Sequence, residues 1–128
     1  MRGAPILDHS LRHLLEEAIN TSTKLTIVLL FASDKNLSAS PAQVSQRLCR
    51  DIWSVEEALK ELAEAGILAD AGGVYRYRPA HTWTDSLGRL LTTYDEPLRR
   101  QEIVRVVGDL DRYAPYRHLL NSRIVPVA

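Results

Sequence analysis

The order of helix and strand signals across residues 40–78 constrains the fold of this chain more than any other feature. The segment reads SPAQVSQRLCRDIWSVEEALKELAEAGILADAGGVYRYR. Two short helical patterns follow one another across a turn of three to four residues. Gly66 ends the second helix, because glycine readily adopts the left-handed conformation found at helix C-termini. Residues 67–69 and 74–78 are strand-like runs joined through the tip at residues 70–73, which indicates a β-hairpin.

Both predicted helices of this segment carry start signals. Ser40 is a favourable N-cap, Pro41 has the preset φ of a first helical residue, and Gln43 can complete a capping box. Asp51 is suited to cap the second helix. The inward stripe of that helix consists of Val55, Ala58, Leu59 and Leu62. The local signals therefore agree with a helix-turn-helix followed by a hairpin.

The region before this segment predicts two further helices. Either Asp8 or Ser10 can cap the first, which residues 20–22 end and whose apolar residues recur at helical spacing. The next run, KLTIVLLFA, is rich in β-branched residues, which is typical of a strand, but its apolar residues also form a helical stripe. We predict a buried helix, because a strand here would leave the helix-turn-helix without its inner helix. Residues 37–39 are expected to form a short first strand.

Helical patterns return after Pro79. Thr82 and Asp85 form a candidate capping pair for a helix whose stripe ends at Tyr94, and Pro97 starts another helix. Residues 113–116 are expected to end that helix. The 128 residues fit a single domain with a winged-helix core at 23–79 and helical extensions at 1–22 and 80–128. The predicted fold class is mainly α with a small β-hairpin wing.

Composition indicates the cellular compartment expected for this chain. No apolar run approaches the roughly 20 residues that span a bilayer, and the N-terminus lacks the apolar core of a secretory signal. Cys49 is the single cysteine, so it has no partner for an internal disulfide, as is common in reducing compartments. We therefore expect a cytoplasmic protein without a membrane segment.

The second helix of the segment carries a family resemblance. Residues 55–68, VEEALKELAEAGIL, resemble the recognition helix and first wing strand of bacterial winged-helix regulators of the MarR and ArsR kind. SPAQVSQRL resembles the first helix-turn-helix element of these regulators, and the match extends over residues 23–79. Cys49 stands where this family usually has a glycine, and we expect it to adopt an ordinary turn.

The resemblance implies a transcriptional regulator that binds double-stranded DNA, as a homodimer formed through its terminal helices. The second helix would enter the major groove. The residues implied to hold phosphates are Arg47, Arg50, Arg76 and Arg78. Those implied to lie nearest the bases are Trp53, Ser54 and Lys60. The two wing arginines share one strand face, and Tyr75 and Tyr77 share the other, because side chains alternate along a strand. This spacing fits equally well a basic wing that contacts phosphates and a solvated strand face whose tyrosines pack on the core.

The distribution of charge supports an alternative, a winged helix that contacts protein and does not bind DNA. Lysine plus arginine total 16 and so do aspartate plus glutamate, whereas nucleic-acid-binding domains are usually basic. Residues 41–70 hold three basic side chains (Arg47, Arg50, Lys60) and six acidic ones (Asp51, Glu56, Glu57, Glu61, Glu64, Asp70). Trp53 lies outside the inward stripe, where an exposed indole would suit an anchor for a partner. The alternative, which we favour, is that Trp53 packs against the C-terminal helices.

The sequence contains no recognisable enzyme motif. It has no glycine-rich phosphate loop and no nucleophile elbow, and Cys49 has no identifiable histidine partner. His9 and His13 are four residues apart, but two histidines alone do not complete a metal site. We therefore predict no catalytic residues, no metal and no cofactor.

Overall fold

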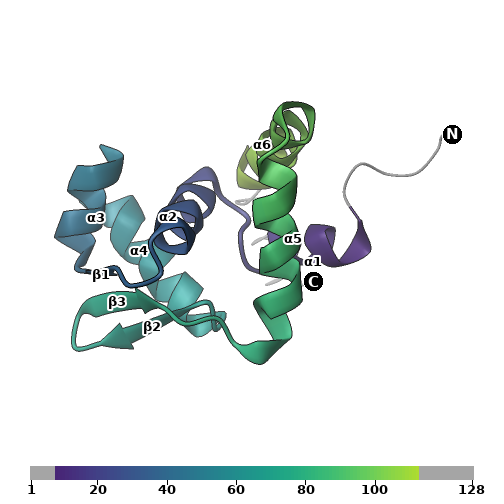
Figure 1. The fold of residues 1–128 in the computed structure, drawn as a ribbon. Coiled ribbons are helices and arrows are strands. Elements are labelled where there is room, and N and C mark those ends of the chain that lie inside the picture. Colours follow the sequence, from purple (N-terminus) through teal and green to yellow (C-terminus); the bar gives the residue numbers. More distant parts are fainter. Residues whose placement is uncertain (1–7, 113–128) are drawn as a thin grey trace, which may run out of the picture.

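The computed structural model describes residues 8–112, which form a mainly helical fold with a small three-stranded antiparallel sheet (Figure 1). The helices are α1 (His9–Glu17), α2 (Ser22–Ser33), α3 (Pro41–Leu48), α4 (Ile52–Glu64), α5 (Thr84–Tyr94) and α6 (Pro97–Arg112), with the 3₁₀ helix η1 (His81–Trp83) before α5. The strands are β1 (Ser38–Ala39), β2 (Leu68–Ala71) and β3 (Val74–Tyr77). The predicted helix end at residues 113–116 lies outside the described residues.

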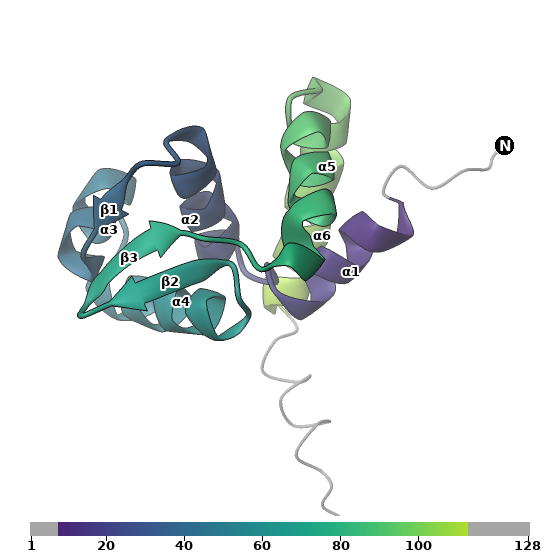
Figure 2. The same ribbon diagram turned by 60° about the horizontal axis from the view of Figure 1, so that its bottom comes forward.

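The elements gather in two groups that share one core. Figures 1 and 2 show α2, α3, α4 and the sheet on one side and α1, α5 and α6 on the other. The buried apolar side chains of both groups form a single cluster. At its centre is α2, which contacts α3, α4, β3 and α6 and fully buries Ile27, Val28 and Phe31. The prediction of a buried helix over KLTIVLLFA is confirmed.

The predicted helix starts of the central segment are also confirmed. The Ser40 hydroxyl accepts from the amide of Gln43, and the Gln43 side chain accepts in return from the amide of Ser40 at 2.9 Å, which completes the capping box. Asp51 caps α4 by accepting from the amide of Ser54 at 2.8 Å. Asp8 does the same for α1. These caps satisfy amides that the first turn of a helix leaves without a partner.

The start predicted for α5 is wrong. We expected Thr82 and Asp85 to cap it, but η1 occupies residues 81–83, and α5 begins at Thr84 without a side-chain cap. Trp83 sits at this junction, where its indole nitrogen donates to the carbonyl of Ala65 at 2.7 Å. Its ring also lies 5.8 Å from that of His13. Trp83 thus ties the start of α5 to the end of α4 and to α1.

The hairpin follows α4 directly. Gly66 has φ +90°, and the amides of Gly66 and Ile67 donate to the carbonyls of Ala63 and Leu62, so α4 ends in a Schellman motif. The strand order is β1-β3-β2, antiparallel throughout. β2 continues to Ala71, beyond the predicted end at residue 69. The tip is therefore the pair Gly72–Gly73, both with positive φ.

Cys49 ends α3 in the left-handed conformation, with φ +54°. The amides of Cys49 and Arg50 donate to the carbonyls of Gln46 and Ser45, which is the hydrogen-bond pattern seen again at Gly66. The expectation of an ordinary turn is therefore wrong. A side chain with a Cβ is strained at this position, because the Cβ lies close to the following carbonyl oxygen.

Cys49 provides a test of this strain. We expect Cys49→Gly to raise the free energy of unfolding by about 0.5–1 kcal/mol, because glycine adopts positive φ without the steric penalty. Cys49→Val should lower it, since a β-branched residue tolerates this conformation least. Urea unfolding followed by tryptophan fluorescence measures both changes. A Cys49→Gly variant less stable than the wild type would contradict the assigned backbone conformation.

Candidate nucleic-acid interface

The residues predicted to contact DNA lie on the α3–α4 and hairpin part of the fold, but they do not form one surface. Arg47 is on α3, Arg50 is in the turn before α4, and Arg76 and Arg78 belong to β3 and its end. The remaining three, Trp53, Ser54 and Lys60, are on α4. The structure places three of the predicted arginines along the sheet, whereas the predicted residues of α4 are surrounded by exposed carboxylates.

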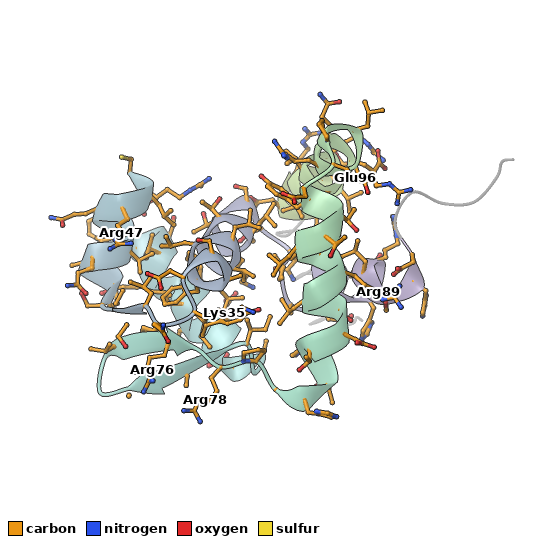
Figure 3. The ribbon with its side chains drawn as sticks, viewed as in Figure 1. Lys35, Arg47, Arg76, Arg78, Arg89 and Glu96 are labelled. Carbon is orange, nitrogen blue, oxygen red and sulfur yellow. The ribbon has the colours of Figure 1, made fainter. Side chains whose placement is uncertain are left out.

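The outer surface of the sheet carries Arg76. In the strand register Arg76 lies between Ser38 of β1 and Ala69 of β2, and its side chain is exposed. Tyr75 points to the other side, where only 5% of it is accessible, and Tyr77 is half-buried. The predicted alternation of arginines and tyrosines is confirmed at these positions. Figure 3 shows Arg76 and Arg78 pointing away from the helices.

Arg47 adjoins this surface across β1. It lines a hollow of about 160 Å³ between α3 and β1, together with Leu37, Ser38, Ala39, Gln43 and Gln46. Lys35, in the loop between α2 and β1, is exposed in the same half of the molecule (Figure 3). We call Lys35, Arg47, Arg76 and Arg78 the basic face. Lys35 was not among the residues predicted from the sequence, although it lies three residues before Ser38, where β1 begins.

Internal partners distinguish the cations of the flanking helices from these. Arg100 donates to the backbone carbonyls of Tyr94 and Asp95. Arg12, Arg89, Arg99, Arg105 and Arg112 each form an ion pair with an aspartate or glutamate. Within residues 8–112, the side chains of the basic face and of Lys60 form no hydrogen bond or ion pair. Binding an external anion there would break no internal ion pair.

Arg50 does not belong to the basic face. Its guanidinium donates to the hydroxyls of Thr23 at 3.2 Å and Thr26 at 3.4 Å, and the side chain is half-buried. Arg50 thus ties the turn between α3 and α4 to α2. Of the four arginines predicted to hold phosphates, this one is engaged inside the fold.

Trp53 is 76% exposed, so the expectation that it packs against the C-terminal helices is wrong. The reason is that α5 and α6 pack on α1, on α2 and on each other, away from the start of α4. Ser54 and Lys60 are exposed, as are Glu56 and Glu57. The solvent-facing side of α4 therefore combines a free indole with an excess of carboxylates.

The sheet separates the two kinds of charge. Asp70 lies opposite Tyr75 in the register, on the side of the sheet that faces the helices. Burial raises the pKa of the Tyr75 hydroxyl, and the negative charges of Asp70 and Glu56 raise this pKa further. Carboxylates therefore approach the helix side of the hairpin, whereas Arg76 and Arg78 occupy its outer side.

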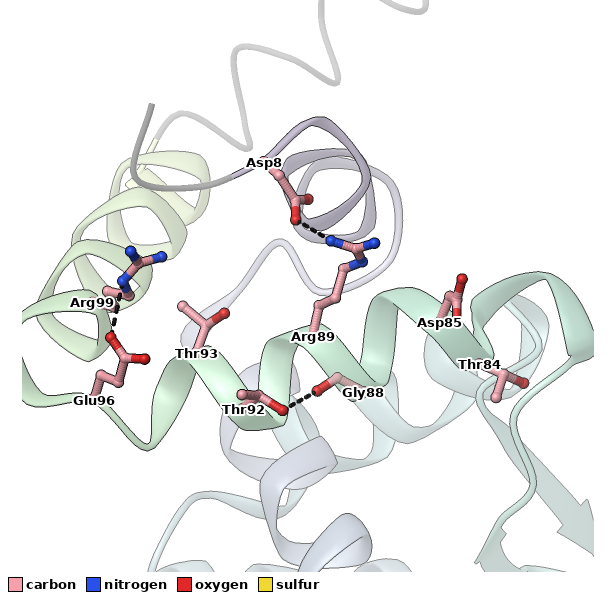
Figure 4. A pocket seen from close by; sticks show the side chains of 9 residues that line it. All are labelled: Asp8, Thr84, Asp85, Gly88, Arg89, Thr92, Thr93, Glu96 and Arg99. Atoms are coloured by element: carbon pink, nitrogen blue, oxygen red, sulfur yellow. Dashed lines mark hydrogen bonds and ion pairs between the residues drawn. The ribbon is translucent and has the colours of Figure 1, made fainter. Parts of the chain in front are cut away.

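A separate groove of about 630 Å³ runs along the outer side of α5 (Figure 4). Its lining consists of Asp8, Thr84, Asp85, Gly88, Arg89, Thr92, Thr93, Glu96 and Arg99. The ion pairs Arg89–Asp8, at 2.8 Å, and Arg99–Glu96, at 2.9 Å, border it. None of these residues was predicted to bind a ligand, although Thr84, Gly88 and Thr92 recur every four residues on one side of the helix. Both arginines already have carboxylate partners, which distinguishes this groove from the basic face.

Two further properties of the described chain bear on function. Among residues 8–112, no cluster of three or more histidine, cysteine, aspartate or glutamate side chains could hold a metal ion. In the same range, no helix combines the length and apolar character needed to cross a lipid bilayer.

The cap of α4 makes a pH-dependent contribution to stability. Hydrogen bonds from the amide and the hydroxyl of Ser54 hold the pKa of Asp51 below its ordinary value of 3.8. A carboxyl whose pKa is lowered in the folded state stabilises the fold above its ordinary pKa, and this stabilisation is lost as the pH falls through the folded-state pKa. Asparagine also caps helices but does not titrate in this range.

We therefore expect the difference in unfolding free energy between the wild type and Asp51→Asn to shrink as the solution is acidified from about pH 7 to about pH 3. Urea unfolding of both proteins across this range measures the difference. The same difference at both ends of the range would show that Asp51 titrates alike in the folded and unfolded chains.

The geometry thus consists of an unpaired basic face along α3, β1 and β3, an acidic α4 with an exposed tryptophan, and a polar groove on α5. No likeness to known proteins adds to this picture. Residues 55–68 resemble MarR and ArsR regulators in sequence, and this resemblance stays a prediction. Comparisons with protein-family models, with characterised proteins and with solved structures found no match.

Proposed function

We propose that residues 22–78 form a winged helix-turn-helix that binds double-stranded DNA, and that the chain acts as a transcriptional regulator. The order of elements supports this proposal. An inner helix, a short strand, two helices joined by a tight turn and a two-stranded hairpin follow one another from α2 to β3, with β1 paired to β3.

The distribution of unpaired cations carries the proposal. Within the described part of the chain, the lysines and arginines without internal partners all lie between residues 35 and 78. They are Lys35, Arg47, Lys60, Arg76 and Arg78. Phosphate contacts by such side chains supply most of the affinity of proteins for DNA, because each contact releases condensed counterions. A neutral total charge is compatible with this role when the positive charge is concentrated on one face.

The proposal includes a homodimer, formed in the cytoplasm through the terminal helices. On α6, Leu98 is 80% exposed and Val104 is also exposed, which leaves apolar surface for a second copy. The free thiol of Cys49 is exposed and suits a reducing compartment.

A salt titration tests DNA binding. If the four cations of the basic face each neutralise one phosphate, the logarithm of the association constant should fall with the logarithm of salt concentration with a slope of about −3 to −4 per protomer. Fluorescence anisotropy with a pool of random-sequence duplexes measures this slope. Arg105→Gln is the matched control, because it removes one charge from α6, where Arg105 pairs with Glu102 and Asp109. Absence of binding by the wild type at low salt would overturn the proposal.

A second candidate function is contact with a protein partner through α4. The exposed indole of Trp53 favours it, because tryptophan is enriched at the energetic centres of protein interfaces. Glu56 and Glu57 follow three and four residues later, so their side chains lie on the same helix face as Trp53. An aromatic ring flanked by carboxylates matches a partner segment that carries lysine or arginine.

Trp53→Ala tests this second candidate. We expect a partner protein captured from nuclease-treated lysate by the immobilised wild type to be lost with the variant, because truncation of an interface tryptophan typically costs more than 2 kcal/mol. Glu17→Gln, an exposed change on α1, serves as the control. Capture of no protein by the wild type, or capture of the same protein by Trp53→Ala, would exclude this candidate.

A further inference from the structure

The basic face includes cations from α3 and β3, which flank β1 on its two sides. Ser38 of β1 lies at its centre, since it lines the hollow with Arg47 on one side and pairs with Arg76 of β3 on the other. Arg78 follows two residues after Arg76, so it extends the same side of the strand. The register thus places cations from α3 and β3 on both sides of one exposed serine.

Neutral hydrogen-bond donors accompany these cations. The residues that line the hollow between α3 and β1 include Ser38, Gln43 and Gln46, whose side chains carry a hydroxyl and two amides. The Gln43 side-chain oxygen already accepts from the amide of Ser40, so its nitrogen is left to donate. Serine and glutamine side chains, together with arginine and lysine, are the usual donors to phosphate oxygens of DNA.

The excess of carboxylates on α4 disfavours the approach of DNA to this helix. Lys60 is the one cation among the exposed side chains of that helix, whereas its carboxylates include Asp51, Glu56, Glu57 and Glu64. The one remaining acidic residue of α4, Glu61, forms an ion pair with Lys24 at 2.6 Å. Asp70 adds negative charge near the hairpin tip, which has no lysine or arginine. A phosphate backbone laid along α4 would therefore meet like charge, which opposes association.

We infer that the DNA backbone lies across the basic face, on the outer side of the sheet and beside α3, and that α4 stays outside the major groove. This inference rests on the proposed function and replaces the docking implied by the sequence resemblance. The one carboxylate in the segment that joins α2 to α3 is Asp34, next to Lys35, so the face keeps an excess of positive charge. Contacts made through phosphates carry no sequence information directly, so affinity depends on salt more than on base sequence.

The test compares charge-matched variants of the full chain on one labelled duplex of about 20 base pairs. We expect Arg76→Gln/Arg78→Gln to weaken binding about tenfold or more and to reduce the salt slope by about 2. Arg47→Gln, on a different element, should reduce the slope by about 1. The control, Arg105→Gln/Arg112→Gln, also removes two positive charges, both from ion-paired residues of α6, and should change the affinity less than about twofold. Circular dichroism checks that each variant keeps the helical content of the wild type.

The outcomes distinguish failure of the inferred docking geometry from failure of the proposed DNA binding. Loss of affinity on removal of Lys60 or Trp53, with Arg76→Gln/Arg78→Gln unchanged, would overturn the inference and leave DNA binding in place. Failure of the wild type to bind any duplex would overturn both. Binding to vesicles of anionic phospholipid but not to the duplex, with the same dependence on Arg76 and Arg78, would overturn the assignment of the face to DNA.

Discussion

The burial of α2 is the constraint on which the rest of the fold depends. This helix is apolar on nearly all sides, and Ile27, Val28 and Phe31 have no accessible surface. Such a helix is stable only when other elements cover it all round, and here α3, α4, β3 and α6 do so. Asp111 of α6 also accepts from the amide and the hydroxyl of Ser22, at the first residue of α2. The flanking helices are therefore part of the same core as the helix-turn-helix.

The hairpin places charges of opposite sign on different sides of the sheet. Because Tyr75 is buried, Arg76 must point outward, and a slip of one residue would exchange the two faces. The Gly72–Gly73 turn fixes the register, since both residues adopt the positive φ of a tight two-residue hairpin. The consequence is a sheet with carboxylates near its helix side and unpaired arginines on its outer side. The proposed DNA contact and the proposed protein contact thus belong to different faces of one small unit.

Local signals in the sequence predicted most of the fold. The capping box at Ser40, the cap at Asp51, the stop at Gly66 and the alternation of Tyr75 and Arg76 depend on a few neighbouring residues, and each was found as predicted. The candidate site was predicted less well. Arg50 hydrogen bonds inside the fold, Trp53 is exposed, and Lys35 and the groove on α5 were missed. Each of these depends on which distant elements pack together, which residue type alone does not determine.

The sequence by itself determined the starts of α3 and α4 and the end of α4, because caps, glycines and side-chain periodicity act over a few residues. It did not determine the start of α5 or the end of β2. It did determine that positive and negative charges are unevenly distributed along the chain. The tertiary structure decided which of those charges share a surface. It placed Arg47 of α3 beside β1, left Lys35 and Arg76 without carboxylate partners, and paired the buried Lys24 of α2 with the exposed Glu61 of α4. The physical reason is that ion pairing and exposure are set by contacts between elements far apart in the chain, and these follow from burial of the common core.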